Sequence, residues 1–227
     1  MSSCPIVTID GPSGSGKGTI SRVIARHVGW QLLDSGALYR LVALAGTVAG
    51  LAQDDVPGHA ELAARMNVAF SVTAAGGERV WLDGQDVAAR IRSETAGQEA
   101  SRVAAWGAVR AALLARQRAF AVPPGLVADG RDMGTVVFPG APLKIFLTAT
   151  PEERALRRHK QLKDKGSDVS LPALSREIAE RDFRDQAREV APLKAAPDAC
   201  VIDSTGVPVE GVVGRVLELM AARGLWP

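Results

Sequence analysis

The sequence predicts an α/β fold in which a five-stranded parallel sheet carries helices on both faces, with a small antiparallel insert and a helical lid. Two observations point to it. Short apolar runs alternate with stretches of helical periodicity along most of the 227 residues, and this alternation is typical of parallel strands joined by helices. In one segment, residues 62–92, apolar and polar residues alternate instead, and this pattern predicts antiparallel strands.

The expected strands of the parallel sheet are short apolar runs bounded by turns or helical stretches. They cover residues 5–9, 30–33, 125–129, 142–149 and 199–204. After the first strand, apolar side chains share one helical face up to Gly29, which ends the helix: Ile20, Val23, Ile24 and Val28. Further helices are expected over 35–50 and 209–224, and another begins at Pro151 behind an N-cap at Thr150.

The insert contains two alternating segments, NVAFSV at 67–72 and RVWLDGQDV at 79–87. Gly76-Gly77 and Asp83-Gly84 supply turn signals, so we expect antiparallel hairpins here. A helical stretch over 94–121 then returns the chain to the parallel core. The expected domains are a core over 1–61, 93–152 and 190–227, an insert over 62–92 that extends functionally into 93–121, and a lid over 153–189.

Composition excludes several classes of protein. Hydrophobic residues make up 47% of the chain and charged residues 23%, which suits a packed core. A net charge of +2 and an aromatic content of 4% do not favour a nucleic-acid partner. No apolar run is long enough to cross a membrane, and residues 1–5 do not resemble a signal peptide. Two cysteines far apart, Cys4 and Cys200, indicate reduced thiols and a cytoplasmic location rather than a metal site.

The segment GPSGSGKGT carries the clearest chemical signal. Gly11 to Lys17 match G-x-x-x-x-G-K, directly after an expected strand and at the start of an expected helix. Glycines allow backbone N–H groups to surround phosphate oxygens, the helix N-terminus adds positive charge, and Lys17 can reach the β- and γ-phosphates. A purely structural glycine-rich turn would not need this spacing and this lysine. We therefore expect a P-loop NTPase core that binds a nucleoside triphosphate, which the resemblance described below identifies as ATP, through Gly11, Pro12, Ser13, Gly14, Ser15, Gly16, Lys17, Gly18 and Thr19.

One position departs from the general loop pattern. Gly18 follows the lysine where Ser or Thr is usual, and the hydroxyl comes one residue later at Thr19. That hydroxyl ordinarily contacts Mg²⁺. We expect Mg²⁺ to accompany ATP, held by Thr19, by water or by the substrate phosphates, with no other direct protein ligand.

Two further strands end in polar clusters. LLDSGALYR at 32–40 presents Ser35 and Arg40, which suit either a phosphate ligand or a plain helix cap beside a solvated arginine. LVADGRDMGT at 126–135 presents Asp129, Arg131 and Asp132, where the alternative is a charged loop. Because carboxyl ends of parallel strands face the ligand crevice, we favour a binding role for the second cluster, with Asp129 ordering Mg²⁺ or its water shell. For Ser35 and Arg40 both readings stay open.

A third cluster follows helical spacing in the segment 171–193. Arg181, Asp185 and Arg188 stand at i, i+4 and i+7, in line with apolar residues nearer the start of the helix. A salt-bridged surface helix is the alternative reading. The preceding stretch at 153–166 is basic, and such a stretch is ordinarily a solvated face. Because GSDVS joins it to the helix that carries Arg181, the two helices could form a lid that closes over ATP. Arginines and few bases suit an acceptor that is itself a phosphate.

Taken together, the chain resembles bacterial cytidylate kinases of the long type. The resemblance rests on IDGPSGSGKGT, LLDSGALYR, ADGRDMGTVVFP, PLKIFLTA and RDFRDQAREVAPL in that order, and on the hairpin insert. It implies phosphoryl transfer from MgATP to CMP or dCMP, with Lys17, Arg131, Arg181 and Asp185 at the reacting group and Arg157 beside ATP. It further implies a CMP site made of Ser35, Arg40, Ser101, Arg110, Asp129, Arg131, Asp132, Arg181, Asp185 and Arg188.

Within that resemblance, Ser101, Arg110 and Asp132 match positions that read the cytosine edge. We expect a monomer that binds small-molecule substrates only. The nearest alternative is another P-loop small-molecule kinase, such as an adenylate or shikimate kinase. A nucleotide-dependent switch is the other alternative, but its guanine-reading N-K-x-D element is missing, since the chain's one asparagine, Asn67, precedes Val68.

Overall fold

The computed structural model describes residues 4–72, 78–164, 166 and 169–226. The predicted Gly76-Gly77 turn lies outside these residues, as does part of the predicted GSDVS connection. The chain divides into two compact units, one formed by Met1–Asp34 with Arg118–Pro227 and the other by Ser35–Gln117. No helix in the described part of the chain is long and apolar enough to cross a membrane.

The first unit is built on a parallel sheet of five strands in the order β2-β6-β1-β7-β8, which confirms the predicted sheet. Every neighbouring pair in it is parallel. The strands are β1 (Ile6–Asp10), β2 (Gln31–Asp34), β6 (Leu126–Gly130), β7 (Leu143–Thr148) and β8 (Cys200–Asp203).

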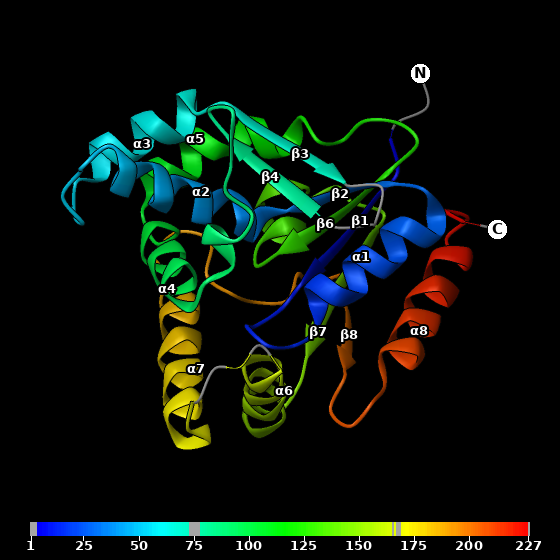
Figure 1. Cartoon of the computed structure of the whole chain (residues 1–227). Coiled ribbons are helices and arrows are strands. Elements are labelled where there is room, and N and C mark those ends of the chain that lie inside the picture. The colour runs from blue at the N-terminus through cyan, green and yellow to red at the C-terminus, as the bar shows by residue number, and fades with distance from the viewer. Residues whose placement is uncertain (1–3, 73–77, 165, 167–168, 227) are drawn as a thin grey trace. The chain divides into compact units, whose positions relative to one another are not determined.

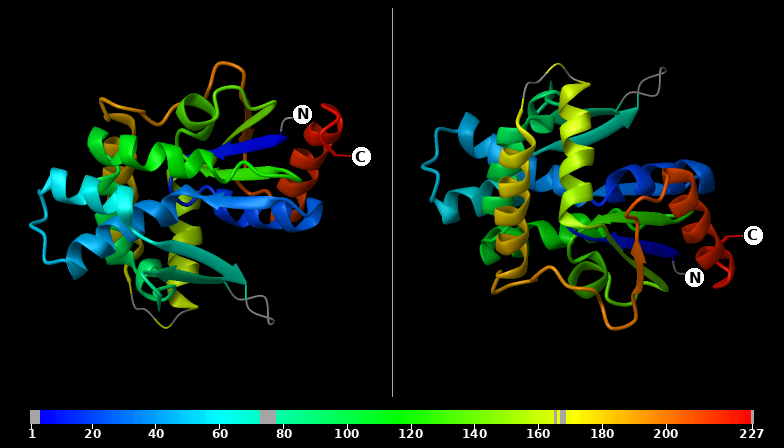
Figure 2. Two further views of the ribbon diagram at one scale, coloured as in Figure 1. Left: turned by 90° about the horizontal axis from the view of Figure 1, so that it is seen from above. Right: turned by 90° about the horizontal axis from the view of Figure 1, so that it is seen from below.

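The two faces of β1 differ. Val7 and Ile9 are fully buried in an apolar core shared with helices α1 (Lys17–Val28) and α8 (Val209–Ala221). These two helices lie side by side on that face of the sheet (Figure 1; Figure 2). On the other face, a short π-helical turn, η2 (Met133–Val137), packs against the strand. The polar end of β1 therefore meets the segment that follows β6.

Helices α6 (Pro151–Lys163) and α7 (Leu171–Gln186) also belong to the first unit and lie side by side (Figure 1). Thr150 caps α6, as predicted, with its hydroxyl accepting from the Glu153 N–H at 3.3 Å. The predicted helix over 171–193 is too long, because α7 ends at Gln186. Its chain turns back there, and the Leu193 N–H donates to the Asp185 carbonyl at 2.8 Å.

The second unit combines helices with a three-stranded antiparallel sheet in the order β3-β4-β5, which confirms the predicted antiparallel insert. Two helical features differ from expectation. Helix α3 was not predicted, although its cap is readable, since the Asp55 carboxylate accepts from the Gly58 N–H at 2.9 Å. The predicted single helical stretch over 94–121 is two helices. The elements are α2 (Ser35–Val48), α3 (Val56–Arg65), β3 (Val68–Val72), β4 (Glu78–Leu82), β5 (Gln85–Asp86), η1 (Arg90–Arg92), α4 (Glu94–Val103) and α5 (Gly107–Arg118).

Candidate active site

The glycine-rich loop connects β1 to the first residue of α1, Lys17. Gly11 allows the loop to pass β7, because a Cβ there would come within 2.0 Å of the Leu147 carbonyl oxygen. Gly16 adopts the left-handed conformation, with φ of 90°, immediately before the helix. Lys17 is almost buried, and its Nζ donates to the Pro12 carbonyl at 3.0 Å. The loop thus folds back around its own lysine.

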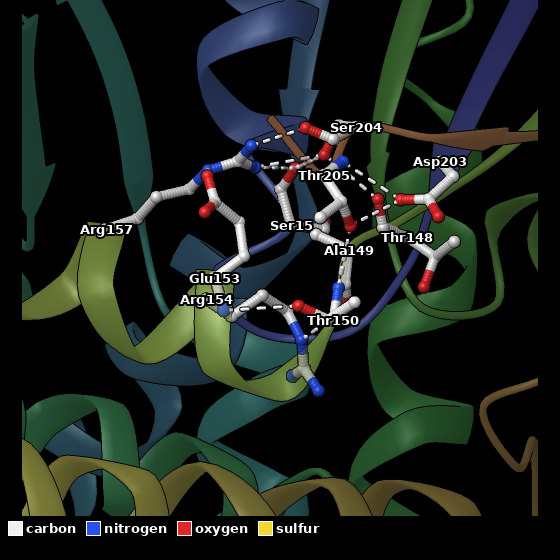
Figure 3. A network of polar contacts seen from close by, with 10 residues as sticks. All are labelled: Ser15, Thr148, Ala149, Thr150, Glu153, Arg154, Arg157, Asp203, Ser204 and Thr205. Atoms are coloured by element: carbon white, nitrogen blue, oxygen red, sulfur yellow. Dashed lines mark hydrogen bonds and ion pairs between the residues drawn. The ribbon is translucent and has the colours of Figure 1, made fainter. Parts of the chain in front are cut away.

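Carbonyl groups of the loop point outward to donors from the rest of the first unit. Arg154 Nη1 donates to the Ser13 carbonyl at 3.0 Å. Ser204 Oγ donates to the Ser15 carbonyl at 3.1 Å, and Arg157 Nη1 lies 3.4 Å from the same oxygen (Figure 3). In a trans peptide the N–H points opposite to the C=O. Outward carbonyls therefore aim N–H groups into the loop, where an anion would accept from them.

Asp129 explains why glycine follows the loop lysine. A Cβ at Gly18 would lie 3.1 Å from Asp129 Oδ2, which is tighter than ordinary contact. The carboxyl group ends β6, is buried, and its Oδ1 has no hydrogen-bond partner among the described residues. Burial and the neighbouring Asp34 raise the pKa of Asp129 to about 6, whereas Lys17 opposes that rise. A buried, unpartnered carboxylate oxygen is suited to a cation or its bound water.

The electrostatic surroundings of Lys17 also suit an anionic ligand. Burial and repulsion from Arg131 lower the pKa of Lys17 to about 7. Asp129 acts in the opposite direction, while Arg181 adds to the repulsion. A bound phosphate would add negative charge beside Lys17 and favour its ammonium form.

Three arginines gather around one buried carboxylate. Arg131 Nε donates to Asp185 Oδ2 at 2.8 Å, and Arg188 Nη2 donates to the other oxygen, Oδ1. Burial alone would raise the pKa of Asp185, but the charges of Arg131, Arg188 and Arg181 outweigh it and hold the pKa below its usual value. The structure therefore brings these four predicted residues together, near Lys17, as a cluster with excess positive charge. Such a cluster suits a polyanion.

Asp10 and Asp132 lie at the same edge of the sheet. Both oxygens of Asp10 accept backbone N–H groups, from Met133 and Gly134, each at 2.8 Å. Asp132, the residue before that turn, is 2% exposed. Sequence reasoning missed Asp10, although a charged residue between a buried strand and a glycine-rich loop was a readable signal.

Four predicted residues belong to the second unit. Ser35 begins α2, and Ser101 lies on α4 with its Oγ buried and without a hydrogen-bond partner among the described residues. Arg40 Nη1 donates to the Ile91 carbonyl at 2.7 Å. Arg110 is buried on α5, donates to the Ala104 carbonyl at 3.1 Å and lies over the Tyr39 ring. Of these four, Ser101 carries the buried hydroxyl, unsatisfied within the described part of the chain, that a ligand could pair with.

Arg157, the residue predicted to lie beside ATP, reaches from α6 to the end of the sheet. Its guanidinium donates to Ser204 Oγ at 2.9 Å and to the Ser204 carbonyl at 2.5 Å, and Glu153 pairs with its Nε at 2.8 Å (Figure 3). Sequence reasoning missed Arg154, because nothing in ERALRRHK distinguishes it from the neighbouring arginines. In the described residues no three His, Cys, Asp or Glu side chains gather as a metal site.

A glycine-rich loop at the carboxyl end of the central strand, with clustered arginines beside it, defines the class of P-loop phosphotransferases. Comparison with known proteins specifies the family. The family model described as cytidylate kinase matches residues 7–222. The chain belongs to the cytidylate kinase family, which confirms the resemblance found in the sequence.

Individual relatives agree with the family model. The chain is 59% identical over 222 residues to a cytidylate kinase of Pseudomonas savastanoi pv. phaseolicola, covering 97% of each chain. It is 56% identical over 221 residues to a cytidylate kinase of Azotobacter vinelandii, covering 97% of this chain and 96% of the relative. A crystal structure of an uncharacterized protein from Eubacterium ventriosum has a TM-score of 0.50 and 11% identity, covering 96% of this chain and 98% of that one. This last likeness shows the fold alone.

Proposed function

We propose that this protein transfers the γ-phosphoryl group of ATP to CMP or dCMP, giving ADP and CDP or dCDP. The observation that carries the proposal is membership of the cytidylate kinase family over residues 7–222. Support from the chain itself comes from the phosphate loop and from the arginine cluster around Asp185. Both suit a reaction between two phosphate-bearing substrates.

ATP would bind with its phosphates in the loop at residues 11–19. Inward N–H groups and the start of α1 would donate hydrogen bonds to the negative oxygens, and Lys17 would contact the β- and γ-phosphates. Arg157 would lie beside the nucleotide, from its position against Ser204. These contacts hold the donor in place and need no proton transfer.

The transfer step needs positive charge and in-line placement more than it needs a base. The acceptor phosphate of CMP is already ionised, so no group has to deprotonate it. Lys17, Arg131 and Arg181 would stabilise the negative charge on the transferring group. Asp185 would orient the arginines, because its two oxygens accept from Arg131 and Arg188. Water excluded from such a site cannot compete as acceptor.

Recognition of CMP would rest on the polar residues that the family resemblance implies. Asp132 would accept from the cytosine amino group, while Arg110 would donate to the ring acceptors and Ser101 would add a hydroxyl. Ser35, Arg40 and Arg131 would lie near the monophosphate and sugar, and Arg188 would contact the nucleotide together with Arg181 and Asp185. Uracil has a carbonyl where cytosine has an amino group. With UMP, the Asp132 carboxylate would lose this hydrogen bond and be repelled by the carbonyl oxygen.

Mg²⁺ fits the residues at the loop. The buried Oδ1 of Asp129 has no hydrogen-bond partner in the described part of the chain, and oxygen is the ligand that Mg²⁺ prefers. Asp129, through water, and the Thr19 hydroxyl would hold the ion together with the phosphates. When bound, Mg²⁺ neutralises phosphate charge and aligns the oxygens of the transferring group.

The proposal extends to organisation and location. The segment 62–92 would form the acceptor-side insert, with 93–121 as its functional extension, and 153–189 would close over ATP as a lid. We further propose a monomer in the cytoplasm, where ATP is abundant and the two thiols, which are free in the structure, stay reduced.

Product analysis tests this function directly. Purified protein incubated with MgATP and CMP should form CDP and ADP in equal amounts, resolved by ion-exchange chromatography. ADP without CDP would contradict the proposal, and so would an absence of both.

A further inference from the structure

Arg154 differs from the other arginines of α6. It is 3% exposed, and its guanidinium donates in three directions. Nε donates to the Ala149 carbonyl at 3.1 Å, Nη1 to the Ser13 carbonyl at 3.0 Å and Nη2 to Asp182 Oδ2 at 2.6 Å. Figure 3 shows Arg154 beside Ala149 and Thr150, while Arg157, from the same helix, reaches Ser204.

Two of these acceptors belong to elements of the proposed nucleotide site. Ser13 is part of the phosphate loop, and a Cβ on the adjacent Gly14 would lie 3.0 Å from the Arg154 Cβ, so the loop rests directly on this side chain. Asp182 lies on α7 next to Arg181 and one helical turn before Asp185. One buried side chain thus joins the ATP loop to the helix whose residues would act on CMP.

The largely buried ion pair between Arg154 and Asp182 makes this connection difficult to separate. Arg154 and Asp182 form an ion pair of side chains that are 4% and 16% exposed, and separating the pair would leave a buried charge uncompensated. Asp182 Oδ1 has no hydrogen-bond partner among the described residues, so Asp182 is tied through Oδ2. A shift of the loop backbone at Ser13 would therefore be passed to α7.

We propose that Arg154 and Asp182 are positioning residues that couple occupancy of the phosphate loop to the placement of Arg181 and Asp185. ATP in the loop would fix Ser13, and the ion pair would then hold α7 where its arginine and carboxylate meet CMP. The two substrates would bind cooperatively as a result. This inference rests on the proposed function.

The test is calorimetric titration of CMP with and without a saturating non-hydrolysable ATP analogue and Mg²⁺. In the wild-type protein the analogue should tighten CMP binding, by a factor of about 5 or more for a typical coupling between sites. Asp182→Asn should bring that factor close to 1, while CMP alone and the analogue alone keep their dissociation constants within about twofold. Arg154→Lys should act likewise, because an ammonium group cannot match three acceptors arranged for a guanidinium.

Glu180→Gln is the matched control, since it removes one carboxylate from an exposed position of the same helix and should retain the wild-type factor. Unchanged coupling in both test variants would overturn the inference, as would a wild-type factor of 1. Equal weakening of the two single-ligand affinities with the factor retained would assign the pair to structure alone, as would failure of both variants to fold. Absence of CMP binding to the wild-type protein would instead overturn the proposed function, and the inference with it.

Discussion

Arg131 donates from its Nε to Oδ2 of Asp185 across 2.8 Å, although the two residues are 54 positions apart in the chain. The contact ties the end of β6 to α7. Arg188 donates to the other oxygen of the same carboxylate, so one acidic side chain orients two arginines. On our account this orientation is what prepares the cluster for phosphate.

Replacing the carboxylate by an amide should destabilise the fold in a pH-dependent way. Asp185→Asn leaves two buried guanidinium groups without their counter-charge, so the free energy of unfolding should fall by about 3–5 kcal/mol at pH 7. The arginines hold the pKa of Asp185 below its usual 3.8 despite burial. Its stabilising effect is therefore present above about pH 4 and is lost as pH falls through the lowered pKa.

Urea unfolding of the wild-type protein and of Asp185→Asn at pH 7 and near pH 3 measures this effect. The difference between their free energies of unfolding should be smaller at the lower pH. Glu61→Gln, which removes one partner of an exposed ion pair with Arg65, is the control and should change little. A gap that is the same at both pH values would contradict the assigned role of the Asp185 charge.

Arg181 should matter to turnover far more than to folding. Arg181→Met would remove the cation that we propose stabilises the transferring phosphoryl group, and kcat should fall by about two orders of magnitude or more. An ADP-release assay gives kcat, and thermal unfolding checks that the fold is intact. Arg184→Met, an exposed position on the same helix, should keep near wild-type turnover. Near-normal turnover in Arg181→Met would refute the assignment.

Asp132 should set the choice between cytosine and uracil. In Asp132→Asn the amide nitrogen can donate to the uracil carbonyl, so the preference for CMP over UMP should fall by about 10-fold or more. The ratio of kcat/KM for the two acceptors measures it. Loss of activity toward both acceptors with the ratio intact would mean that Asp132 does not read the base.

We expect glycine to be required at position 18 because the Asp129 side chain lies close by, not because the backbone conformation demands it. In Gly18→Ala the new methyl group would press on Asp129 Oδ2 at 3.1 Å. KM for MgATP should rise severalfold as that carboxylate shifts, because we propose that it orders the ion and its water. Gly214→Ala on α8, where a Cβ meets nothing within 4 Å, should leave KM unchanged. An unaltered KM in Gly18→Ala would contradict the role given to Asp129.

The parallel sheet and the phosphate loop were predictable because their signals are local. Strand runs, glycine spacing and the loop lysine all lie within short segments, and the structure places them within one or two residues of expectation. The stripe of Arg181 and Asp185 was also predictable from helical periodicity. Arg188 was not correctly placed on that helix, because α7 ends at Gln186 where a tertiary contact, from Leu193 to the Asp185 carbonyl, redirects the chain.

What the sequence could not reveal are contacts that depend on distant segments. Arg154 is one of several basic residues on α6, and only the fold shows that it is buried between the loop and Asp182. Asp10 likewise finds its donors, Met133 and Gly134, more than a hundred positions away. The sequence shows which residues are charged. Which group each charged side chain pairs with becomes known only from the folded structure.

The central claim is that a cytidine monophosphate is the phosphoryl acceptor. We would measure ADP release with MgATP against CMP, dCMP, UMP, AMP, GMP, shikimate and no acceptor, all at one concentration. Our account predicts strong preference for CMP and dCMP. Preference for another acceptor would contradict the roles of Ser101, Arg110 and Asp132, and equal ADP release without any acceptor would contradict the kinase assignment itself.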